Sequence, residues 1–341
     1  SRFYASTATA YRLSAQDPLV NEVAAGIEFS EYSLDGAGAP GSGAPHARFA
    51  QDILLQEGVR SLAYRSQDRV ENLETSRSTM VYVDGTAPLT EAVLTGPRYG
   101  LQPGDSQPGG TQAVGGPLFI ASHTLFGLRA QDPAIADGIP GSGVGRTLYG
   151  LDSGISVPFS TDFPILDEGP HLIGYHSLDN VSNEESLKSF ALSVDSTPPV
   201  TEISFQGYAY RPIPGSGSSP PEADVFIASP TLVVLTARDL VSAQTASGVL
   251  ITRYRIDGGS WIAYSGPFLP AGQGLHVVEW RSWDRVLNEE QNHLLRVAVD
   301  HTPPSTTLSL GEPKTKVFGL DIITPQTPIT LTDKAVVKIL E

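Results

Sequence analysis

Short runs of hydrophobic residues, some of them alternating with polar residues, form the main pattern along this chain. Residues 275–283 and 294–299 are rich in branched and aromatic side chains and alternate in part, which is typical of β-strands. Asp257-Gly258-Gly259 lies between two such runs and is a strong hairpin signal. No stretch combines a long amphipathic helical pattern with capping residues. The pattern therefore predicts many short strands joined by turns.

Four landmarks recur in the same order in three successive stretches. They are a strand that ends in aspartate, a Tyr-x-x-Asp turn, a Ser-x-Asp block followed by Asn and Glu, and a Val-Asp-x-Thr-x-Pro segment. Their aspartates are, in that order, Asp17, Asp132 and Asp239; Asp35, Asp152 and Asp257; Asp68, Asp179 and Asp284; and Asp84, Asp195 and Asp300. The last three are 111 and 105 residues apart. A fourth copy begins and reaches its first landmark at 329–333. The chain is therefore an internal repeat.

The length of the repeat indicates the fold. A unit of about 100 residues with about seven short strands is typical of an immunoglobulin-like or fibronectin-III-like sandwich. We therefore expect an all-β chain of tandem sandwiches, with repeats at 1–85, 86–196 and 197–301 and an incomplete fourth at 302–341. In the third repeat the predicted strands are A at 201–209, B at 231–238, C at 250–256, C′ at 261–265, E at 267–271, F at 275–283 and G at 293–299.

The first and last repeats are predicted to be incomplete in complementary ways. Residues 2–6 align with 118–122 and 225–229, which lead into strand B, so repeat 1 lacks strand A. Residues 306–310 form a surplus strand A, and 317–341 supply strand B. Two explanations are open. The chain is a fragment of a longer array, or the surplus strand of one subunit completes the first repeat of the next and builds a head-to-tail filament.

The third repeat carries a resemblance to a known family. Its motifs are Tyr254-Arg-Ile-Asp-Gly-Gly, Trp261, Tyr264, Gly274-Leu-His, Arg281-Ser-Trp-Asp, Asn288-Glu-Glu and Val299-Asp-His-Thr-Pro-Pro. Together they resemble the bacterial Ig-like repeat of large surface proteins, including the type first named from a leptospiral outer-membrane protein. The resemblance implies a structural or adhesive role at the cell surface. In that family one turn usually has the sequence Asp-x-x-Gly-Asn, whereas here Glu71, Ser182 and Leu287 stand at the glycine position.

Composition excludes several kinds of function. The 37 acidic and 22 basic residues give a net charge of −15, which disfavours nucleic acid and anionic membranes but suits cations. The absence of cysteine excludes disulfides and thiolate chemistry. No run approaches the ~20 apolar residues of a membrane span. The chain also starts at Ser1 with neither a signal peptide nor an initiator Met, as a mature or trimmed product would.

Catalytic motifs are missing from the sequence. The seven histidines show no His-Glu-x-x-His spacing, and neither a Gly-x-Ser-x-Gly elbow nor a Walker sequence is present. His171 and His276 hold equivalent positions at the start of strand F, which favours a structural role. We therefore expect a protein that is not an enzyme.

The repeated aspartates suggest calcium sites. Strands B and F of a sandwich end at the pole where strand A begins, and strand G leads out of the opposite pole. Each linker aspartate should therefore meet the strand ends of the next repeat. The expected groups are Asp84 with Asp132, Asp179 and Asn183, and Asp195 with Asp239, Asp284 and Asn288. Such oxygen ligands suit Ca²⁺, which takes 6–8 of them. The alternative is that each aspartate caps a turn through backbone amides.

Three tryptophans suggest a further binding surface. Trp261, Trp280 and Trp283 all lie in the third repeat, and exposed tryptophan rings can stack on sugars. The alternative is that they belong to the core, since Trp280 alternates with Arg281.

These observations predict an extracellular or cell-surface structural protein. It would be a filament or surface-layer subunit joined by strand exchange between termini, with other copies or neighbouring repeats as partners. The alternatives are an adhesin, a glycan- or protein-binding module, or an accessory region of a larger secreted protein.

Overall fold

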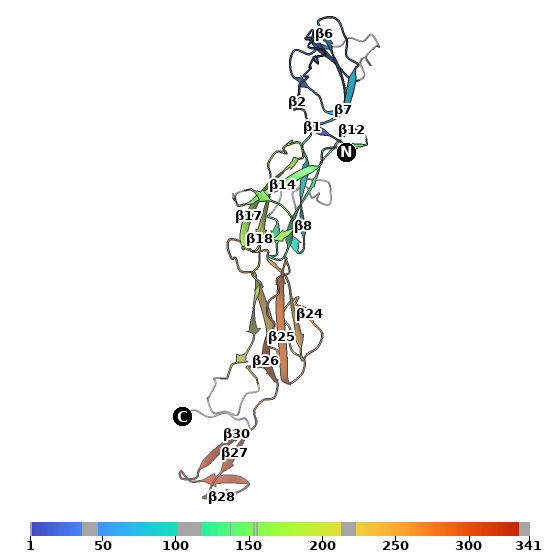
Figure 1. The fold of residues 1–341 in the computed structure, drawn as a ribbon. Helices are drawn as coiled ribbons and strands as arrows, with labels where there is room; N and C mark the ends of the chain where they lie inside the picture. Colours follow the sequence, from blue (N-terminus) through green and yellow to red (C-terminus); the bar gives the residue numbers. More distant parts are fainter. Residues whose placement is uncertain are drawn as a thin grey trace. The chain divides into compact units, whose positions relative to one another are not determined.

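The computed structural model describes residues 2–35, 47–100, 117–136, 138–152, 154, 156–212 and 223–333. Its regular elements over these residues are all strands, which confirms the predicted all-β fold (Figure 1). None of the described residues forms a helix that could cross a membrane. The chain divides into two compact units, Ser1–Ser196 with Ser242–Thr245, and Thr197–Val241 with Ala246–Glu341. Repeats are named below by their predicted ranges, and these boundaries stay predictions.

The first repeat has a five-stranded sheet in the order β1-β7-β6-β3-β4 and a separate pair, β2-β5. The strands are β1 (Tyr4–Ser6), β2 (Ala10–Tyr11), β3 (Ile27–Leu34), β4 (Ala47–Arg48), β5 (Ile53–Leu54), β6 (Gly58–Asp68) and β7 (Arg77–Asp84). A small core between the sheet and the pair includes Ile53, Leu62 and Val83.

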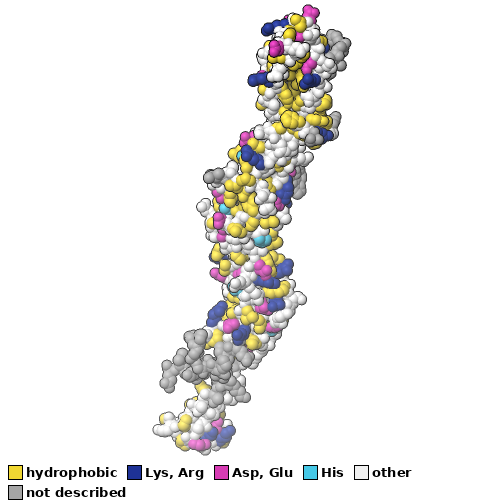
Figure 2. Space-filling model, viewed as in Figure 1, with side chains coloured by type: hydrophobic (Ala, Val, Ile, Leu, Met, Phe, Trp, Pro, Cys, Tyr) yellow, Lys and Arg dark blue, Asp and Glu magenta, His cyan; other side chains and the backbone are white. Residues whose placement is uncertain are grey.

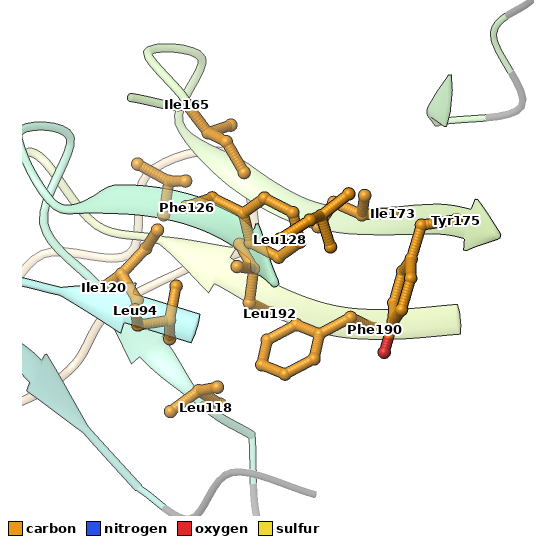
Figure 3. Packing of buried hydrophobic residues seen from close by; sticks show 11 residues of the cluster. Leu94, Leu118, Ile120, Phe126, Leu128, Ile165, Ile173, Tyr175, Phe190 and Leu192 are labelled. Carbon is orange, nitrogen blue, oxygen red and sulfur yellow. The ribbon is translucent and has the colours of Figure 1, made fainter. Parts of the chain in front are cut away.

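The second repeat is a complete sandwich, with sheets β15-β14-β17-β18-β10-β9 and β16-β11-β8. The strands are β8 (Leu89–Thr95), β9 (Arg98–Tyr99), β10 (Phe119–Ile120), β11 (Leu125–Gln131), β12 (Ala134–Ala136), β13 (Ile139–Pro140), β14 (Val144–Leu151), β15 (Val157–Pro158), β16 (Phe163–Pro164), β17 (Gly169–Asp179) and β18 (Lys188–Val194). Phe126, Ile173 and Phe190 converge in its core (Figure 3). Burying each such side chain stabilises the fold by roughly 1.5–3 kcal/mol.

The third repeat has the same plan, with sheets β20-β21-β26-β25-β23-β24 and β19-β22. The strands are β19 (Val200–Gln206), β20 (Ala209–Tyr210), β21 (Val225–Ala228), β22 (Leu232–Arg238), β23 (Val249–Ile256), β24 (Ile262–Ala263), β25 (Gly274–Asp284) and β26 (His293–Asp300). Predicted strand E is reduced to a single bridge between Phe268 and Val233.

One strand of each repeat was not predicted as such. The segments placed before strand B are strands of their own that pair in parallel with the last strand, as β1–β7, β10–β18 and β21–β26. They hold two to four residues. So short a run shows no period, because alternation needs at least four residues to be read.

After the third repeat, β27 (Thr306–Leu310) pairs with β30 (Ile329–Asp333), and β28 (Lys314–Val317) pairs with β29 (Leu320–Ile323). In this register Asp333 lies opposite Thr306, just as Ala237 lies opposite Thr201. Asp333 ends β30, as the predicted landmark requires, but in register it corresponds to Ala237 and not to Asp239, which lies two residues further on.

An aspartate closes the hairpin between the two central strands of each repeat. In the second repeat Asp152 Oδ1 accepts the N–H of Leu172 at 2.9 Å. Its Oδ2 accepts Nδ1–H of His171 at 2.6 Å, and His171 Nε2–H donates to the carbonyl of Asp167 at 2.7 Å. Since both ring nitrogens donate, the arrangement favours the charged imidazolium.

An equivalent contact to the hairpin aspartate recurs in the other two repeats. His276 pairs with Asp257 at 2.8 Å in the third repeat, and Arg60 pairs with Asp35 at 2.9 Å in the first. Because an arginine makes the equivalent contact in the first repeat, His171 is interpreted as a residue that holds the hairpin closed, and its position needs no catalytic explanation.

The second repeat should therefore lose stability on both sides of a pH window. Burial opposes the charge of His171, but its bonds to Asp152 and Asp167 outweigh burial and raise its pKa above 6.5. That stability is complete below 6.5 and is lost as pH rises through the raised pKa. Burial likewise opposes the charge of Asp152, but bonds from Leu172 and His171 lower its pKa below 3.8. Its contribution is complete above 3.8 and is lost as pH falls.

Replacing His171 by arginine should remove the loss at high pH and leave the loss at low pH. Hydrogen exchange of residues 169–179, corrected for the intrinsic pH dependence of exchange, measures this. An equal loss of protection above neutral pH in the wild type and in H171R would contradict the assignment.

Candidate metal centre

Three aspartates of the first unit meet where the first repeat passes into the second. Asp84 is the last residue of β7, Asp132 follows β11, and Asp179 is the last residue of β17. One carboxylate oxygen from each lies within 4.8 Å of the others. The structure thus brings together the three carboxylates that strand topology predicts to meet.

Asp84 is fully buried and contacts the second repeat through both its side chain and its main chain. Its Oδ1 accepts the N–H of Thr86 at 3.2 Å, and its Oδ2 accepts the N–H of Ser142 at 2.6 Å. Its carbonyl oxygen accepts Nδ2–H of Asn183 at 2.9 Å. Asp84 therefore links the end of one repeat to two loops of the next.

The loop at 140–143 is part of this site, which the sequence did not indicate. Its Pro-Gly-Ser-Gly sequence suggests a flexible excursion, like those at 40–43 and 214–217, which lie outside the described residues. Instead, Gly143 N–H donates to Asp132 Oδ2 at 2.6 Å, beside the bond from Ser142 to Asp84. A Cβ at Gly141 would lie 2.5 Å from Asp132 Oδ2, so only glycine fits there. The loop is a backbone nest for two carboxylates.

Asp132 is the member of the cluster with spare coordinating capacity. Its Oδ1 is buried and has no hydrogen-bond partner among the described residues, whereas each oxygen of Asp84 accepts a bond. Burial raises the pKa of Asp132, and the charges of Asp84 and Asp179 add to this against the bond from Gly143. A buried, unpaired carboxylate oxygen beside two further carboxylates fits a hard divalent cation that takes oxygen ligands.

Asp179 and Asn183 act mainly within their own turn. Asp179 Oδ1 accepts the N–H groups of Val181 and Asn183 at 2.9 and 2.7 Å, and its Oδ2 accepts Asn183 Nδ2–H at 2.7 Å. The Asn183 amide thus presents its nitrogen to the cluster and serves as a donor, contrary to the ligand role expected of it.

The same cap occurs in all three repeats. Asp68 with Asn72, and Asp284 with Asn288, repeat these bonds at 2.7–3.0 Å. Turn capping, the alternative to calcium, is therefore an observed role of these aspartates. Since one carboxylate can cap a turn and coordinate an ion, metal binding stays a prediction.

The capped turn has the backbone conformation of a glycine at the position where the bacterial Ig-like repeats that it resembles usually have glycine. Glu71, Ser182 and Leu287 have φ values of 67°, 71° and 69°. Non-glycine residues are strained in this left-handed region, so the turn survives at a cost of about 1 kcal/mol.

Replacing Leu287 by glycine should therefore stabilise the third repeat. We expect a gain of up to about 0.5 kcal/mol, because the relieved strain of about 1 kcal/mol exceeds the extra entropy of an unfolded glycine. Urea unfolding followed by tryptophan fluorescence measures it, since all three tryptophans belong to this repeat. Arg285→Gly, in the same turn but without a positive φ, should instead lose stability. A loss in L287G equal to that in R285G would contradict the strain.

The remaining predicted ligands are divided between the two units. Asp195 belongs to the first unit, where it is fully buried and its N–H donates to the carbonyl of Ile120 at 2.9 Å. Asp239, Asp284 and Asn288 belong to the second unit. There Asp239 Oδ2 accepts the N–H of Gly248 at 2.6 Å, in the way that Asp132 accepts that of Gly143.

The three tryptophans do not form one surface. Trp280 lies in the core of the third repeat and donates Nε1–H to the carbonyl of Thr201 at 3.1 Å. Trp261 and Trp283 are half-buried, and the Arg281 guanidinium lies 4.5 and 4.9 Å from their ring centroids. Because arginine already stacks on both rings, they offer little face for a sugar. Glycan binding stays a prediction without support from these contacts.

Comparison with known proteins gives no sequence match. No protein-family model matches the chain, and no curated protein matches it. Among solved structures, the fibronectin(III)-like modules of CbhA from Clostridium thermocellum align with a TM-score of 0.28 and 8% identity, covering 54% of this chain and 89% of that one. A 1.5-MDa bacterial ice-binding adhesin aligns with a TM-score of 0.29 and 7% identity, covering 81% of this chain and 88% of that one.

A third solved structure is SGBP-B from Bacteroides ovatus in complex with a mixed-linkage heptasaccharide. It aligns with a TM-score of 0.16 and 12% identity, covering 83% of this chain and 62% of that one. At such low TM-scores the fold assignment rests on the strand pairings of the chain itself. The leptospiral type of repeat stays a prediction.

Proposed function

We propose that this chain is a non-enzymatic structural array of Ig-like repeats that works at the cell surface or outside the cell, with a divalent cation, Ca²⁺, holding the joint between repeats. The observation that carries the proposal is the cluster of Asp84, Asp132 and Asp179, which takes its carboxylates from both sides of one joint. On the face drawn in Figure 2, acidic and basic side chains are interspersed. The cluster at the joint therefore concentrates negative charge, whereas on the face in Figure 2 the two signs of charge are mixed.

The role of each residue follows from its contacts. Asp132 supplies the buried oxygen that lacks a partner, and Asp84 supplies the charge from the preceding repeat. Asp179 supplies a carboxylate whose position is fixed by its own turn. A bound Ca²⁺ would offset the mutual repulsion of the three, and water would complete its 6–8 ligands. Rotation at the joint would then require one ligand to leave.

Calorimetric titration of the chelator-treated chain with Ca²⁺ tests the proposal, with Mg²⁺ and the variant Asp84→Asn as controls. We expect heat of binding and a higher melting temperature with Ca²⁺, and a smaller response with Mg²⁺, which demands stricter octahedral geometry. In Asp84→Asn the response should be lost or strongly reduced. Absence of both heat and melting shift in the wild type would refute the cation joint.

A second part of the proposal is head-to-tail self-association by strand exchange, which would build a filament or surface layer. Its support is the first repeat, in which β2 pairs only with β5 among the described strands, whereas its counterparts β11 and β22 also pair with a strand A. Hydrophobic side chains reach the surface of this repeat, at the top of the view (Figure 2).

Light scattering and electron microscopy of the full chain at increasing concentration test this part. We expect polymers that are lost in Leu308→Asp and kept in Thr307→Asp, since both residues are exposed in the single chain and alternate along β27. Monomers at every concentration would refute self-association and leave the cation joint unaffected.

A further inference from the structure

A buried polar contact fastens strand A of the second repeat, β8, to β17 and the turn after it on the opposite sheet. Thr90 Oγ1 and Ser177 Oγ are 2.6 Å apart, and Thr90 N–H donates to Glu185 Oε1 at 2.9 Å. Lys188, which pairs with Glu185, donates to the carbonyl of Thr90 at 2.8 Å. All polar atoms of Thr90 are therefore held by the other sheet.

The third repeat fastens its strand A in the same way. Thr201 N–H and Oγ1–H donate to the two oxygens of Glu290, each at 2.6 Å. Thr201 Oγ1 also lies 2.5 Å from Ser282 Oγ, and His293 stands where the second repeat has Lys188. A threonine on strand A and a Ser/Glu pair on the opposite sheet thus form one recognition unit, present twice.

The first repeat has the receiving half of this unit without the threonine. Ser66 and Glu74 occupy the positions of Ser177 and Glu185, and Arg77 pairs with Glu74 at 3.1 Å as Lys188 does with Glu185. The side chain of Glu74 is 36% exposed, whereas the side chains of Glu185 and Glu290 are each 6% exposed. We call Ser66, Glu74 and Arg77 the Ser66–Glu74 socket.

A groove runs from the socket along the residues that continue β2. It has a volume of about 1050 Å³, and Tyr11, Leu13, Ser66 and Glu74 line it. Tyr11 and Leu13 are only half-buried, but their counterparts Phe126 and Leu128 are 0% and 4% exposed beneath strand A. The buried hydroxyl of Tyr11 has no hydrogen-bond partner. The groove thus presents a row of apolar side chains and a polar anchor at strand spacing.

We propose that this groove binds residues Thr306–Leu310 of a second copy of the chain, with Thr306 seated in the Ser66–Glu74 socket. This inference rests on the proposed self-association and names the contact through which it occurs. Thr306 follows its Thr-Pro-Pro linker segment at the spacing that Thr201 follows Thr197-Pro198-Pro199. Its N–H and hydroxyl would supply Glu74 with the two donors that Thr201 gives Glu290.

The register of the docked strand follows from the two complete repeats. Thr90 lies opposite Ala130, and Thr201 lies opposite Ala237. Thr306 of the second copy would therefore lie opposite Ala15, Leu308 opposite Leu13, and Leu310 opposite Tyr11. The leucines would cover the half-buried apolar side chains of the groove.

The donated strand is poorly protected within its own chain. Among the described strands β27 pairs only with β30, and Leu308 and Leu331 are each 61% exposed. An isolated pair of strands is marginally stable in water. Docking would replace the five-residue ladder between β27 and β30 by an equivalent ladder between β27 and residues 11–15 of the other copy. It would in addition bury Leu308 and Leu310. Apolar burial therefore favours the docked state.

Cross-linking between copies tests the docking and its register. The chain has no cysteine, so single-cysteine variants report single contacts. Ser14→Cys mixed with Thr307→Cys should form a mixed disulfide dimer, because these positions would face each other within the ~4.4–6.8 Å Cα distance that a disulfide requires. The matched control, Gln16→Cys with Thr307→Cys, is two residues out of register and should form little. Equal yields in the two mixtures, or no cross-link in either, would overturn the inference.

The chemistry of the socket is tested by sedimentation equilibrium of the full chain. Thr306→Val keeps the shape and the backbone N–H but lacks the hydroxyl, and should weaken copy-to-copy association by at least about tenfold because Glu74 loses one of the two donors that Thr306 would supply. Thr306→Ser should restore it. Glu74→Ala should match Thr306→Val, whereas Glu71→Gln, in the same turn but outside the groove, should have no effect.

The outcomes separate this inference from the proposed function. Association that is insensitive to Thr306→Val and gives no in-register cross-link would leave self-association standing and overturn the strand docking. In-register dimers without longer polymers would keep the docking and overturn the filament.

Discussion

Replacing Glu290 by alanine should lower the free energy of unfolding of the third repeat by about 3 kcal/mol. Glu290 is 6% exposed and accepts bonds from Thr201 N–H, Thr201 Oγ1–H and Ser282 N–H at 2.6, 2.6 and 3.0 Å. Thr201 and Ser282 are themselves buried. Without the carboxylate the N–H groups of Thr201 and Ser282 stay in the core without their acceptor, which costs more than the bonds contribute when made.

Urea unfolding followed by tryptophan fluorescence measures this effect. Glu289→Ala is the matched control, because Glu289 is the exposed neighbour and pairs with Arg281 on the surface. Exposed pairs of this kind contribute about 0–1 kcal/mol. In the first repeat of the dilute, unassociated chain, Glu74→Ala should leave the protection of β6 against hydrogen exchange almost unchanged, since no described strand of the same chain occupies the position of strand A there. A small effect of Glu290→Ala, equal to that of Glu289→Ala, would show that the buried network does not fasten strand A.

Asp132→Asn should change the melting temperature in opposite directions with and without calcium. The pKa of Asp132 is raised first by burial and then by Asp84 and Asp179. Its contribution to stability therefore falls as pH rises from the pKa of an unfolded aspartate through the raised one. At neutral pH in chelator, the neutral amide removes this loss and should raise the melting temperature.

In saturating Ca²⁺ the same substitution should be unfavourable. An ion at 100 times its dissociation constant stabilises the native state by about 2.7 kcal/mol, and Asp132→Asn removes a ligand and a charge that this gain requires. Scanning calorimetry in chelator and in Ca²⁺ measures both signs on one protein. A rise in both conditions would mean that the cluster holds no ion, and a fall in both would mean that Asp132 is needed for structure alone.

The fold was largely predictable from the sequence because hydrophobic and polar residues alternate along the long strands. Strands C and G of the third repeat differ from β23 and β26 by one residue at one end, and strand F differs from β25 by one residue at each end. The parallel strands β1, β10 and β21 were not found, since two to four residues carry no period and their partner is the far end of the repeat. Strand E shrank to the Phe268 bridge because a single pairing suffices to close the smaller sheet there.

The candidate site was predictable in part, and for a different reason. The expected strand directions alone placed Asp84 beside Asp132 and Asp179, because they determine at which pole of the sandwich each strand ends. The donors that surround them were missed because Ser142 and Gly143 act through backbone N–H groups, which no side-chain pattern reveals. Trp280 was grouped with the half-buried Trp261 and Trp283 by proximity in the sequence, whereas its alternation with Arg281 indicated the core position that the structure shows.

The parallel pairing within each repeat bears on how such an array would carry mechanical load. A short strand near the start of each repeat lies beside the last strand, Ala5 opposite Val83 in the first and Ile227 opposite Val299 in the third. Because the two strands run in the same direction, a pull on the two ends of a repeat draws them past each other. The hydrogen bonds of the pair are then loaded together in shear and do not open one at a time. Resistance to force is governed by the rate of unfolding, so these few short pairs would set how long a stretched repeat stays folded.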